Sequence, residues 1–217
     1  DGDHWVLNGE KYFSSHADLA EFLIVMVITN PDVPVHQGAS MFLVPRDTPG
    51  LQFLRMAGLA GEPLGQGHHP HLRYENVRVP ADNLLGGEGQ AFAIAQTRLG
   101  GGRIHHAMRT VAMVKRALAM MCERALSRRT QGESLAQKQM VQQYVADSFI
   151  GLEQFRLLVL HTAWLIDKGR KKDARTYIAA VKVAMADVLH DVVRRSLQVH
   201  GALGCSNEMP LSALWMT

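Results

Sequence analysis

The chain has 217 residues, enough for one large domain or two small ones with a buried core. Apolar residues make up 47 % and charged residues 20 %, as is ordinary for a globular protein, and the formal net charge is only +3. Lys and Arg are spread along the sequence, which argues against nucleic acid as a ligand. Cys122 and Cys205 provide no disulfide framework and fit a reducing compartment. The longest apolar run, residues 22–28, is too short to span a bilayer.

Residues 1–86 form the first predicted domain and carry the patterns of short β-strands. Asn8-Gly9 supplies the positive φ angles of a type I′ turn, so a hairpin of residues 4–7 and 10–14 is expected. Four further strand-like runs follow, at residues 20–29, 39–45, 51–55 and 71–80, with Gly, Pro and Asp clusters between them. Strands joined by turns without intervening helices predict an antiparallel β-barrel or sandwich.

Residues 87–217 form the second predicted domain, where the apolar period becomes that of an α-helix. Three apolar stripes run from Ile104 to Ala125 through Met108, from Leu135 to Leu165 through Phe149, and from Ile178 to Leu197. Three long amphipathic helices with short links predict an up-and-down α-helical bundle. The expected fold class is therefore α+β.

The ends of these helices also have sequence signals. Ser134 and Gln137 match a capping box before the second helix, Gly169 is placed to end it, and Gly201 to end the third. A fourth helix is expected to begin near Leu211. The sequence has no initiator Met, starts inside the expected hairpin and stops in an apolar run, so we expect a piece of a longer protein.

The 11 histidines raise the question of a metal site. His105 and His106 are adjacent on a predicted helix, so their side chains diverge by ~100° and cannot chelate one ion together. His68, His69 and His71 lie in a Gly- and Pro-rich stretch, where solvated or edge-strand histidines are the simpler interpretation. No His-x-x-x-His or His-Glu-x-x-His pattern occurs, and no metal is expected.

Gly100, Gly101, Gly102 and Arg103 form the most unusual short stretch of the sequence. Neither the Walker nor the Rossmann pattern fits these glycines. Two interpretations remain open. The glycines can permit a tight approach between the helix and a neighbour, or they can leave room for a ligand with Arg103 as its anion partner.

Three other polar junctions also have simple structural explanations. Ser14 and Ser15 can end a strand, Arg128 and Arg129 can form a solvated helix end, and residues 198–204 can be a helix end capped by glycine. The sequence shows no recognisable Ser-His-Asp or Cys-His pattern of an enzyme that uses a nucleophile. Spacing alone therefore indicates a β domain, a helical bundle and polar junctions of undetermined role.

Taken in order, these junctions resemble the acyl-CoA dehydrogenase flavoprotein family. The resemblance rests on residues 7–15, 77–80, 87–92, 102–103, 127–132 with Gln139, and 198–201. It covers nearly the whole chain, and the ordered series is more specific than any one motif. The stretches RLGGGRIHHAMRT and GALGCSNEMPL are most similar to the branch of acyl-CoA dehydrogenase family members ten and eleven.

The resemblance implies FAD, bound between the β domain and the bundle and across a subunit interface. Phe13, Ser14 and Ser15 match the segment beside the flavin ring, and Arg128 matches the arginine that reaches the pyrophosphate of a neighbouring subunit's FAD. Gln131 replaces the usual aromatic residue of this motif. The other implied cofactor positions are Thr130, Gln198, Val199, His200, Gly201 and Ala202.

The resemblance also implies a substrate site and a reaction. Gly100, Gly101, Gly102 and Arg103 match the helix segment that lines the acyl-CoA site, with Arg103 beside the CoA portion. The implied reaction is α,β-dehydrogenation, in which a carboxylate removes the α-proton and the β-hydride passes to flavin N5. Gly102 stands where some family members carry that carboxylate. The base is therefore expected beyond Thr217, and the chain alone is expected to be inactive.

Homodimers or homotetramers are implied, with electron-transfer flavoprotein as the electron acceptor. The family's locations are the cytoplasm in bacteria and the mitochondrion or peroxisome in eukaryotes. Two alternatives stay open: an acyl-CoA oxidase-like flavoprotein with the same fold, and a non-catalytic helical module that oligomerises.

Overall fold

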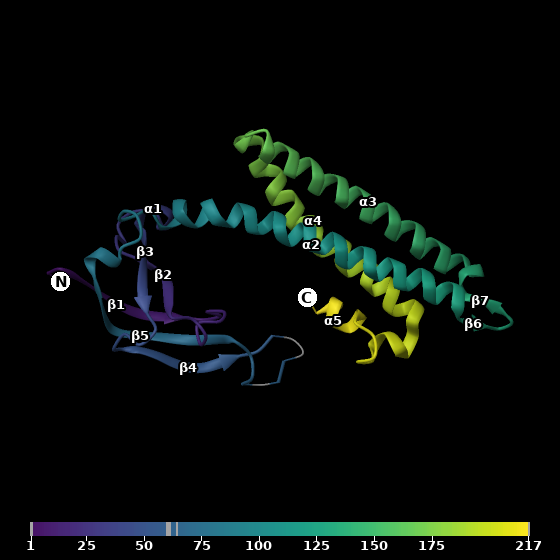
Figure 1. Cartoon of the computed structure of the whole chain (residues 1–217), viewed down its shortest axis with the longest axis horizontal. Helices are drawn as coiled ribbons and strands as arrows, with labels where there is room; N and C mark the ends of the chain where they lie inside the picture. The colour runs from purple at the N-terminus through teal and green to yellow at the C-terminus, as the bar shows by residue number, and fades with distance from the viewer. Residues whose placement is uncertain (1, 60–61, 64, 217) are drawn as a thin grey trace. The chain divides into compact units, whose positions relative to one another are not determined.

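The structure is a computed structural model that describes residues 2–59, 62–63 and 65–216 (Figure 1). In chain order its main elements are β1 (His4–Lys11), β2 (Phe22–Ile28), α1 (Val35–Gly38), β3 (Ala39–Pro45), β4 (Leu51–Ala57), β5 (His69–Pro80), α2 (Ala91–Ser127), β6 (Arg129–Thr130), β7 (Glu133–Ser134), α3 (Gln139–Asp167), α4 (Lys171–His200) and α5 (Leu211–Trp215). The chain divides into two compact units, Asp1–Arg98 and Leu99–Thr217. Each unit is described by itself.

The first unit contains two antiparallel sheets, ordered β1-β5-β4 and β2-β3. Alternate residues of both sheets point into one core, as the period of a strand requires. Trp5 of β1 packs on Phe42 of β3, with ring centroids 5.3 Å apart. The buried core residues include Leu7, Leu23, Val25, Phe42, Val44, Leu72, Tyr74, Val77 and Val79. The sandwich form of the prediction is confirmed, and the described strands do not close a barrel.

The predicted hairpin at Asn8-Gly9 is wrong, because β1 continues straight through this pair. Both halves of β1 pair with β5, and a β-bulge lies between Leu7 and Gly9. The Asn8 side-chain oxygen accepts a hydrogen bond from the backbone N–H of Asn76 at 2.8 Å, and Asn76 has a positive φ of 52°. Asn-Gly suits a bulge as well as a turn. The partner strand, distant in the sequence, decides between them.

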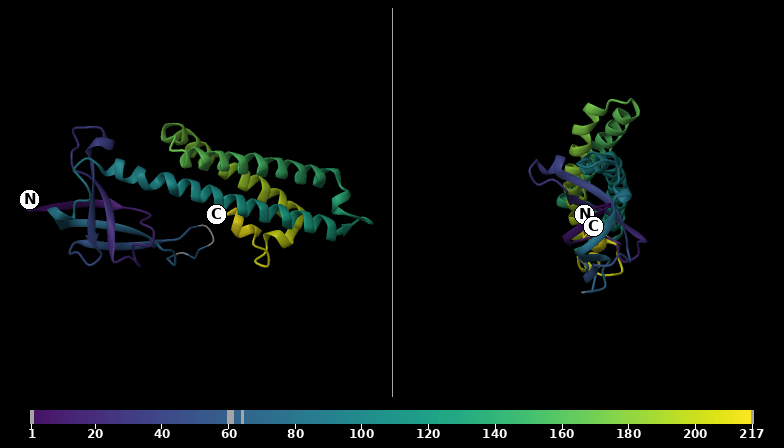
Figure 2. Two further views of the ribbon diagram at one scale, coloured as in Figure 1. Left: turned by 45° about the horizontal axis from the view of Figure 1, so that its top comes forward. Right: turned by 90° about the vertical axis from the view of Figure 1, so that its left-hand side faces the viewer.

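In the second unit α3 runs antiparallel to α2, and α4 runs antiparallel to α3 (Figures 1 and 2). The predicted up-and-down bundle is therefore confirmed. Its main core combines residues of α2, α3, α4 and α5: Val114, Ala117, Leu118, Met121, Ala125, Leu152, Leu189, Val192, Val193, Val199 and Leu211. The first turns of α2 belong to the other unit, where Ala91 packs with Ala39 and Met41.

Two residues of the predicted stripes do not face this core. Met108 and Phe149 are each 57 % exposed. The neighbouring residues Ala107 and Ser148 take the buried positions instead. Adjacent helical residues diverge by about 100°, so only one of each pair can face the core.

The predicted helix ends are confirmed. The backbone N–H of Ser134 donates to Oε1 of Gln137 at 3.0 Å, although this capping contact precedes a short 3-10 turn, Leu135–Gln137, rather than α3 itself. Gly169 and Gly201 follow α3 and α4 with φ angles of 68° and 63°, which suit glycine. The last helix, α5, begins at Leu211 as expected.

Helix α3 is long and apolar enough, by length and composition, to cross a membrane. This is weak evidence for a span, because a core helix meets the same criteria. One face of α3 does lie in the bundle core, with Leu152, Phe155, Val159 and Leu165 buried.

Truncating Phe42 should destabilise the β unit by about 3–5 kcal/mol, because its side chain is fully buried between the two sheets. Urea unfolding of F42A should show a lower midpoint with an unchanged slope. The matched control is F22A on the adjacent strand β2, whose side chain is 53 % exposed and whose loss should cost less than about 1 kcal/mol. Equal losses for the two variants would contradict this packing.

Candidate functional site

The segment that follows β1 is a turn with an unusual backbone. Phe13 and His16 have φ angles of 56° and 61°, the left-handed region that residues other than glycine rarely adopt. Each such residue costs on the order of 1–3 kcal/mol and persists only where its surroundings hold it. A strained turn with an aromatic residue at its tip is therefore a candidate for a functional segment.

Backbone hydrogen bonds fix this turn to the start of β5. The N–H of Ser14 donates to the carbonyl of Pro70 at 3.1 Å, and the N–H of His16 donates to the carbonyl of His68 at 2.7 Å. Within the turn, the N–H of Ser15 donates to the carbonyl of Phe13 at 2.9 Å. These bonds offset the backbone strain.

Two side-chain pairs reinforce the same contact. The Ser15 hydroxyl lies 2.8 Å from Nδ1 of His69, and Oδ2 of Asp18 lies 2.7 Å from Nδ1 of His68. The expectation of solvated histidines holds for His68, whose side chain is 51 % exposed, but His68 and His69 also each have a specific polar partner about 50 residues away in the sequence. Among the described residues, no group of three or more His, Cys, Asp or Glu side chains is arranged to hold a metal ion.

Asp18 is the most buried member of this cluster. Its carboxylate is only 14 % exposed, and Oδ1 is buried without a hydrogen-bond partner in the described part of the chain. The hydrogen bond from His68 lowers the pKa of Asp18 below its ordinary value, against the opposing effect of burial. The His68 contact therefore favours the ionised form of this carboxylate.

The turn presents one aromatic face to the outside. Phe13 is 53 % exposed and packs on Tyr12, with ring centroids 3.9 Å apart, while the Arg55 guanidinium lies 4.7 Å from the Tyr12 ring. Ser14 and Ser15 line a cleft of about 400 Å³ that continues along β2. An open ring face beside hydroxyl groups and a cleft can receive a flat, polar ligand.

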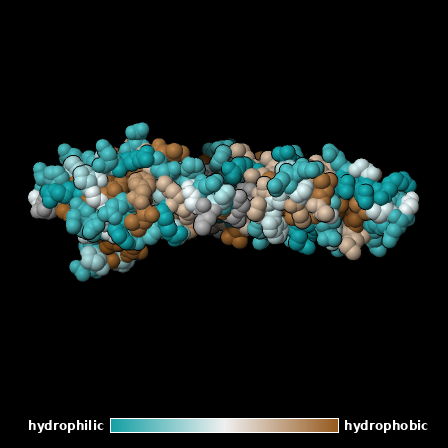
Figure 3. All heavy atoms as spheres, turned by 90° about the horizontal axis from the view of Figure 1, so that it is seen from below, coloured by the Kyte–Doolittle hydropathy of each residue, from teal (hydrophilic) through white to brown (hydrophobic). Residues whose placement is uncertain are grey.

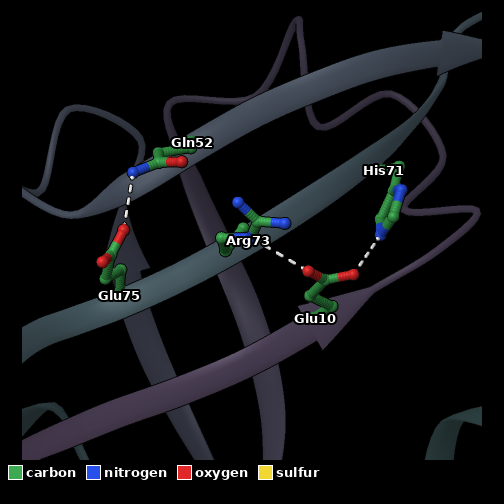
Figure 4. A network of polar contacts seen from close by, with 5 residues as sticks. All are labelled: Glu10, Gln52, His71, Arg73 and Glu75. Atoms are coloured by element: carbon green, nitrogen blue, oxygen red, sulfur yellow. Dashed lines mark hydrogen bonds and ion pairs between the residues drawn. The ribbon is translucent and has the colours of Figure 1, made fainter.

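The outer face of the three-stranded sheet carries a polar network at the point where β1 ends (Figure 4). Nε of Arg73 donates to Oε1 of Glu10 at 2.9 Å, and Nε2 of His71 lies 2.8 Å from Oε2. The hydrogen bond from Arg73, followed by that from His71, lowers the pKa of Glu10. Gln52 of β4 donates to Glu75 of β5 at 3.1 Å. The network joins β1, β4 and β5 next to the turn.

Gly100, Gly101 and Gly102 lie inside α2 rather than at its start. A Cβ atom added to any of them would meet no heavy atom of the described residues within 4 Å. No described residue makes that close approach, and both interpretations of the glycines stay predictions. Three glycines in a helix interior cost about 2–3 kcal/mol relative to alanine. Arg103, which follows them, is half-buried.

Arg128 is the first residue after α2 and is exposed. Its backbone carbonyl accepts the N–H of Leu135 at 2.9 Å, so the following β6–β7 hairpin is closed against the helix end. Gln131 and Gly132 form the tip of this hairpin, with φ angles of 54° and 85°. Thr130 is half-buried in β6.

A second arginine precedes Arg128 by one helical turn. Arg124 is half-buried, and its Nε is buried with no hydrogen-bond partner in the described residues. The backbone N–H of Arg128 donates to the carbonyl of Arg124 at 3.0 Å, so the helical turn continues to Arg128. Residues four apart share a helix face, and the two arginines therefore lie on the same side of this helix end. Arg124 is not among the site residues predicted from the sequence. The i, i+4 spacing of the two arginines is the signal that identifies it.

The five residues from Gln198 to Ala202 divide into two groups. Val199 and His200 are buried, and Nδ1 of His200 donates to the backbone carbonyl of Ser196 at 2.8 Å. These two side chains serve the packing of α4. Gln198, Gly201 and Ala202 are exposed and can meet a ligand.

The structure brings some of these positions together and separates others. Ala125, near the end of α2, and Val199, near the end of α4, belong to one core cluster, so the predicted positions at both helix ends lie at the same end of the bundle. Gly102 lies 25 residues before Ser127 in the same helix, a distance of about 40 Å.

Comparison with known proteins agrees with this architecture. Residues 1–77 match the acyl-CoA dehydrogenase middle-domain family, and residues 89–217 match the acyl-CoA dehydrogenase C-terminal domain family. The chain belongs to the acyl-CoA dehydrogenase family.

Particular relatives can also be named. The chain is 47 % identical to the Mycobacterium tuberculosis protein FadE2, named as an acyl-CoA dehydrogenase, over 99 % of this chain and 53 % of that protein. It is 39 % identical to acyl-CoA dehydrogenase family member 11 of Rattus norvegicus, over 99 % of this chain and 28 % of that protein. A solved Mycobacterium abscessus structure described as an acyl-CoA dehydrogenase superposes with a TM-score of 0.92 at 38 % identity, covering 100 % of this chain and 54 % of that one. The chain thus spans about half or less of these relatives.

Replacing His68 by alanine should raise the pKa of Asp18 toward its ordinary value, because the largest cause of the lowered pKa is removed. A carboxylate whose pKa is depressed by folding stabilises the fold above its unfolded pKa. That stability is lost as the pH falls below about 4, through the lower folded pKa. Carboxyl NMR titration of Asp18 in wild type and H68A measures the shift. An H36A control should leave it unchanged, and an unaltered Asp18 titration in H68A would disprove the pairing.

Proposed function

We propose that this chain is the middle and C-terminal part of an FAD-dependent acyl-CoA dehydrogenase, which oxidises an acyl-CoA thioester between its α and β carbons. The observation that carries the proposal is the strained turn of residues 12–16, where an exposed aromatic face and two serines adjoin a cleft in a chain of this family. Phe13 supports the face of the flavin ring in this proposal, and Ser14 and Ser15 provide hydrogen bonds to its edge.

The end of α2 fits the anionic part of FAD. Arg128 is exposed, and the buried Nε of Arg124 has no partner among the described residues. A buried donor without a partner costs about 1–3 kcal/mol, so the fold gives up stability at this helix end. We propose that Arg128 binds the pyrophosphate directly, with Arg124 one turn behind it, and that Thr130, Gln198, Gly201 and Ala202 line the same site. Val199 and His200 would contribute through their backbone.

Gly100, Gly101 and Gly102 expose the backbone of α2, where acyl-CoA can lie against the helix. Since no described residue lies within 4 Å of a Cβ added at these positions, the cost of the three glycines supports a ligand there. Arg103 would serve the CoA portion. FAD, when bound, supplies flavin N5 as the acceptor of the β-hydride, and the longer protein would pass electrons to electron-transfer flavoprotein.

We propose that the catalytic carboxylate lies outside these 217 residues. Gly102 occupies the position where the family resemblance places the base in some members, and glycine carries no proton-accepting group. The residues present here would bind and orient FAD and the thioester, while the carboxylate would remove the α-proton.

A homodimer or homotetramer is part of the proposal. The glycines of α2 and Arg128 just after its end are about 40 Å apart, so they would serve different active sites in an assembly. Exposed apolar side chains interrupt the polar surface (Figure 3). Those on α3 support burial against another subunit: Met140, Phe149, Ile150, Leu157, Leu160, Trp164 and Ile166.

R128M should weaken FAD binding about tenfold to a hundredfold, because charge-assisted hydrogen bonds contribute about 1.5–3 kcal/mol each. Fluorescence titration of the apoprotein with FAD measures the change. R116M is the matched control, since Arg116 is an exposed arginine of α2 about three turns before Arg128 and on a different helix face. An affinity in R128M equal to that of R116M would rule out this role for Arg128.

The longer protein that contains this chain should be purified as a yellow dimer or tetramer, and acyl-CoA should bleach its flavin absorbance under anaerobic conditions. The 217-residue chain alone should show no turnover with an artificial electron acceptor, because the proposed base is missing. Rapid formation of hydrogen peroxide on reoxidation would indicate an oxidase instead. A colourless oligomer that ignores acyl-CoA would indicate a non-catalytic module.

A further inference from the structure

The Ser15 hydroxyl has a single proton, and its hydrogen-bond partner in this chain is His69. We propose that His69 is a positioning residue, which sets the direction in which the Ser15 hydroxyl hydrogen-bonds to the flavin ring. The inference rests on the proposed FAD site and extends it to a residue that makes no contact with FAD itself.

The geometry that supports this is local and well defined. Nδ1 of His69 lies 2.8 Å from Oγ of Ser15, within the range of an O–H···N or N–H···O hydrogen bond. Ser15 is exposed beside its cleft, whereas His69 is half-buried at the first position of β5. The serine can therefore reach a ligand while the histidine behind it is held by the sheet.

The backbone on both sides keeps the pair together. The N–H of Ser14 bonds to the carbonyl of Pro70, the residue after His69, and the N–H of His16 bonds to the carbonyl of His68, the residue before it. The neighbours of Ser15 are thus hydrogen-bonded through their backbones to the neighbours of His69. The His16 ring lies near His69, with centroids 6.3 Å apart, but no hydrogen bond joins these two rings among the described contacts.

The chemistry follows from what each group can donate. If Nδ1 of His69 is unprotonated, it accepts a hydrogen bond from the Ser15 hydroxyl. The hydroxyl then offers only its lone pairs to the cleft. If Nδ1 carries a proton, it donates to Oγ, and the hydroxyl proton is free to point into the cleft. Oxidised flavin has acceptor nitrogens and oxygens at its edge, whereas the reduced ring gains N–H donors. The proton position on His69 therefore favours one redox form of the bound ring over the other.

A purely structural role is the competing explanation, in which His69 only braces the strained turn. Both roles predict weaker FAD binding when His69 is replaced. The two roles predict different reduction potentials for the bound flavin. Bracing the turn changes the affinity for oxidised and reduced FAD equally, whereas the direction of the Ser15 hydroxyl changes the affinity for one form more than for the other. The two roles differ also in whether the effect requires the Ser15 hydroxyl.

The test is a double-mutant cycle in the longer, FAD-loaded protein with wild type, S15A, H69F and S15A/H69F. H69F keeps a ring of similar shape and removes the nitrogen. H69F should change the flavin absorption spectrum and shift the relative affinity for the two redox forms by up to about tenfold, which corresponds to ~30 mV for two electrons. In the S15A background, the H69F substitution should change neither the flavin spectrum nor the relative affinity for the two redox forms any further.

Two further variants complete the design. H69N places an amide near the position of Nδ1 and should restore the potential and spectrum toward wild type. H71F is the matched control, because His71 lies two residues along β5 and pairs with Glu10 instead of Ser15. The potential of H71F should equal that of wild type.

An equal shift from H69F with and without the Ser15 hydroxyl, or no shift in either background, overturns the inference. If H69F does not fold, the H69N potential and the imidazole ¹⁵N shifts of His69 in wild type and S15A decide the question. Unchanged ¹⁵N shifts in S15A would contradict the hydrogen bond. A wild-type protein that binds no FAD would refute the proposed function as well, whereas a yellow protein without the Ser15–His69 coupling refutes only this inference.

Discussion

The contact between the turn at residues 13–18 and the start of β5 is the constraint on which the candidate site depends. Phe13 and His16 adopt left-handed backbone angles that are unfavourable in isolation. Residues 68–70 hold that conformation through backbone and side-chain hydrogen bonds across about 50 residues of sequence. Because β1 pairs with β5 along its whole length, the turn leaves the sheet at one defined point. The same hydrogen bonds fix the position of the aromatic face and the two serines relative to β5.

The bundle imposes a second constraint, which is length. A single uninterrupted α2 carries both the open glycine segment and the arginines at its end, about 40 Å apart. One chain cannot bend these groups toward the same small ligand. In the proposed assembly the two groups would serve different active sites, so the helix needs no bend. The exposed apolar residues of α3 are compatible with such an assembly.

Unsatisfied polar atoms lie close to the proposed ligand positions. Oδ1 of Asp18 and Nε of Arg124 are both buried without partners among the described residues, although buried polar atoms are normally paired. One lies beside the strained turn and the other one helical turn before Arg128. The glycines of α2 likewise reduce helix stability, and no described residue packs within 4 Å of a Cβ added there. In each place the fold gives up stability next to a residue that the proposed function requires.

Local patterns in the sequence determined the change from strand to helix period, the helix ends at Gly169 and Gly201, and the family to which the chain belongs. Helix periodicity and capping depend on residues a few positions apart, so a single sequence contains them. Tertiary structure alone decided that Asn8-Gly9 forms a bulge, and that His68 and His69 contact Asp18 and Ser15. It also placed Ser148 rather than Phe149 against α4, where Arg195 donates to its hydroxyl at 3.5 Å. These outcomes depend on which distant strand or helix lies alongside, and nothing in the local sequence records that partner.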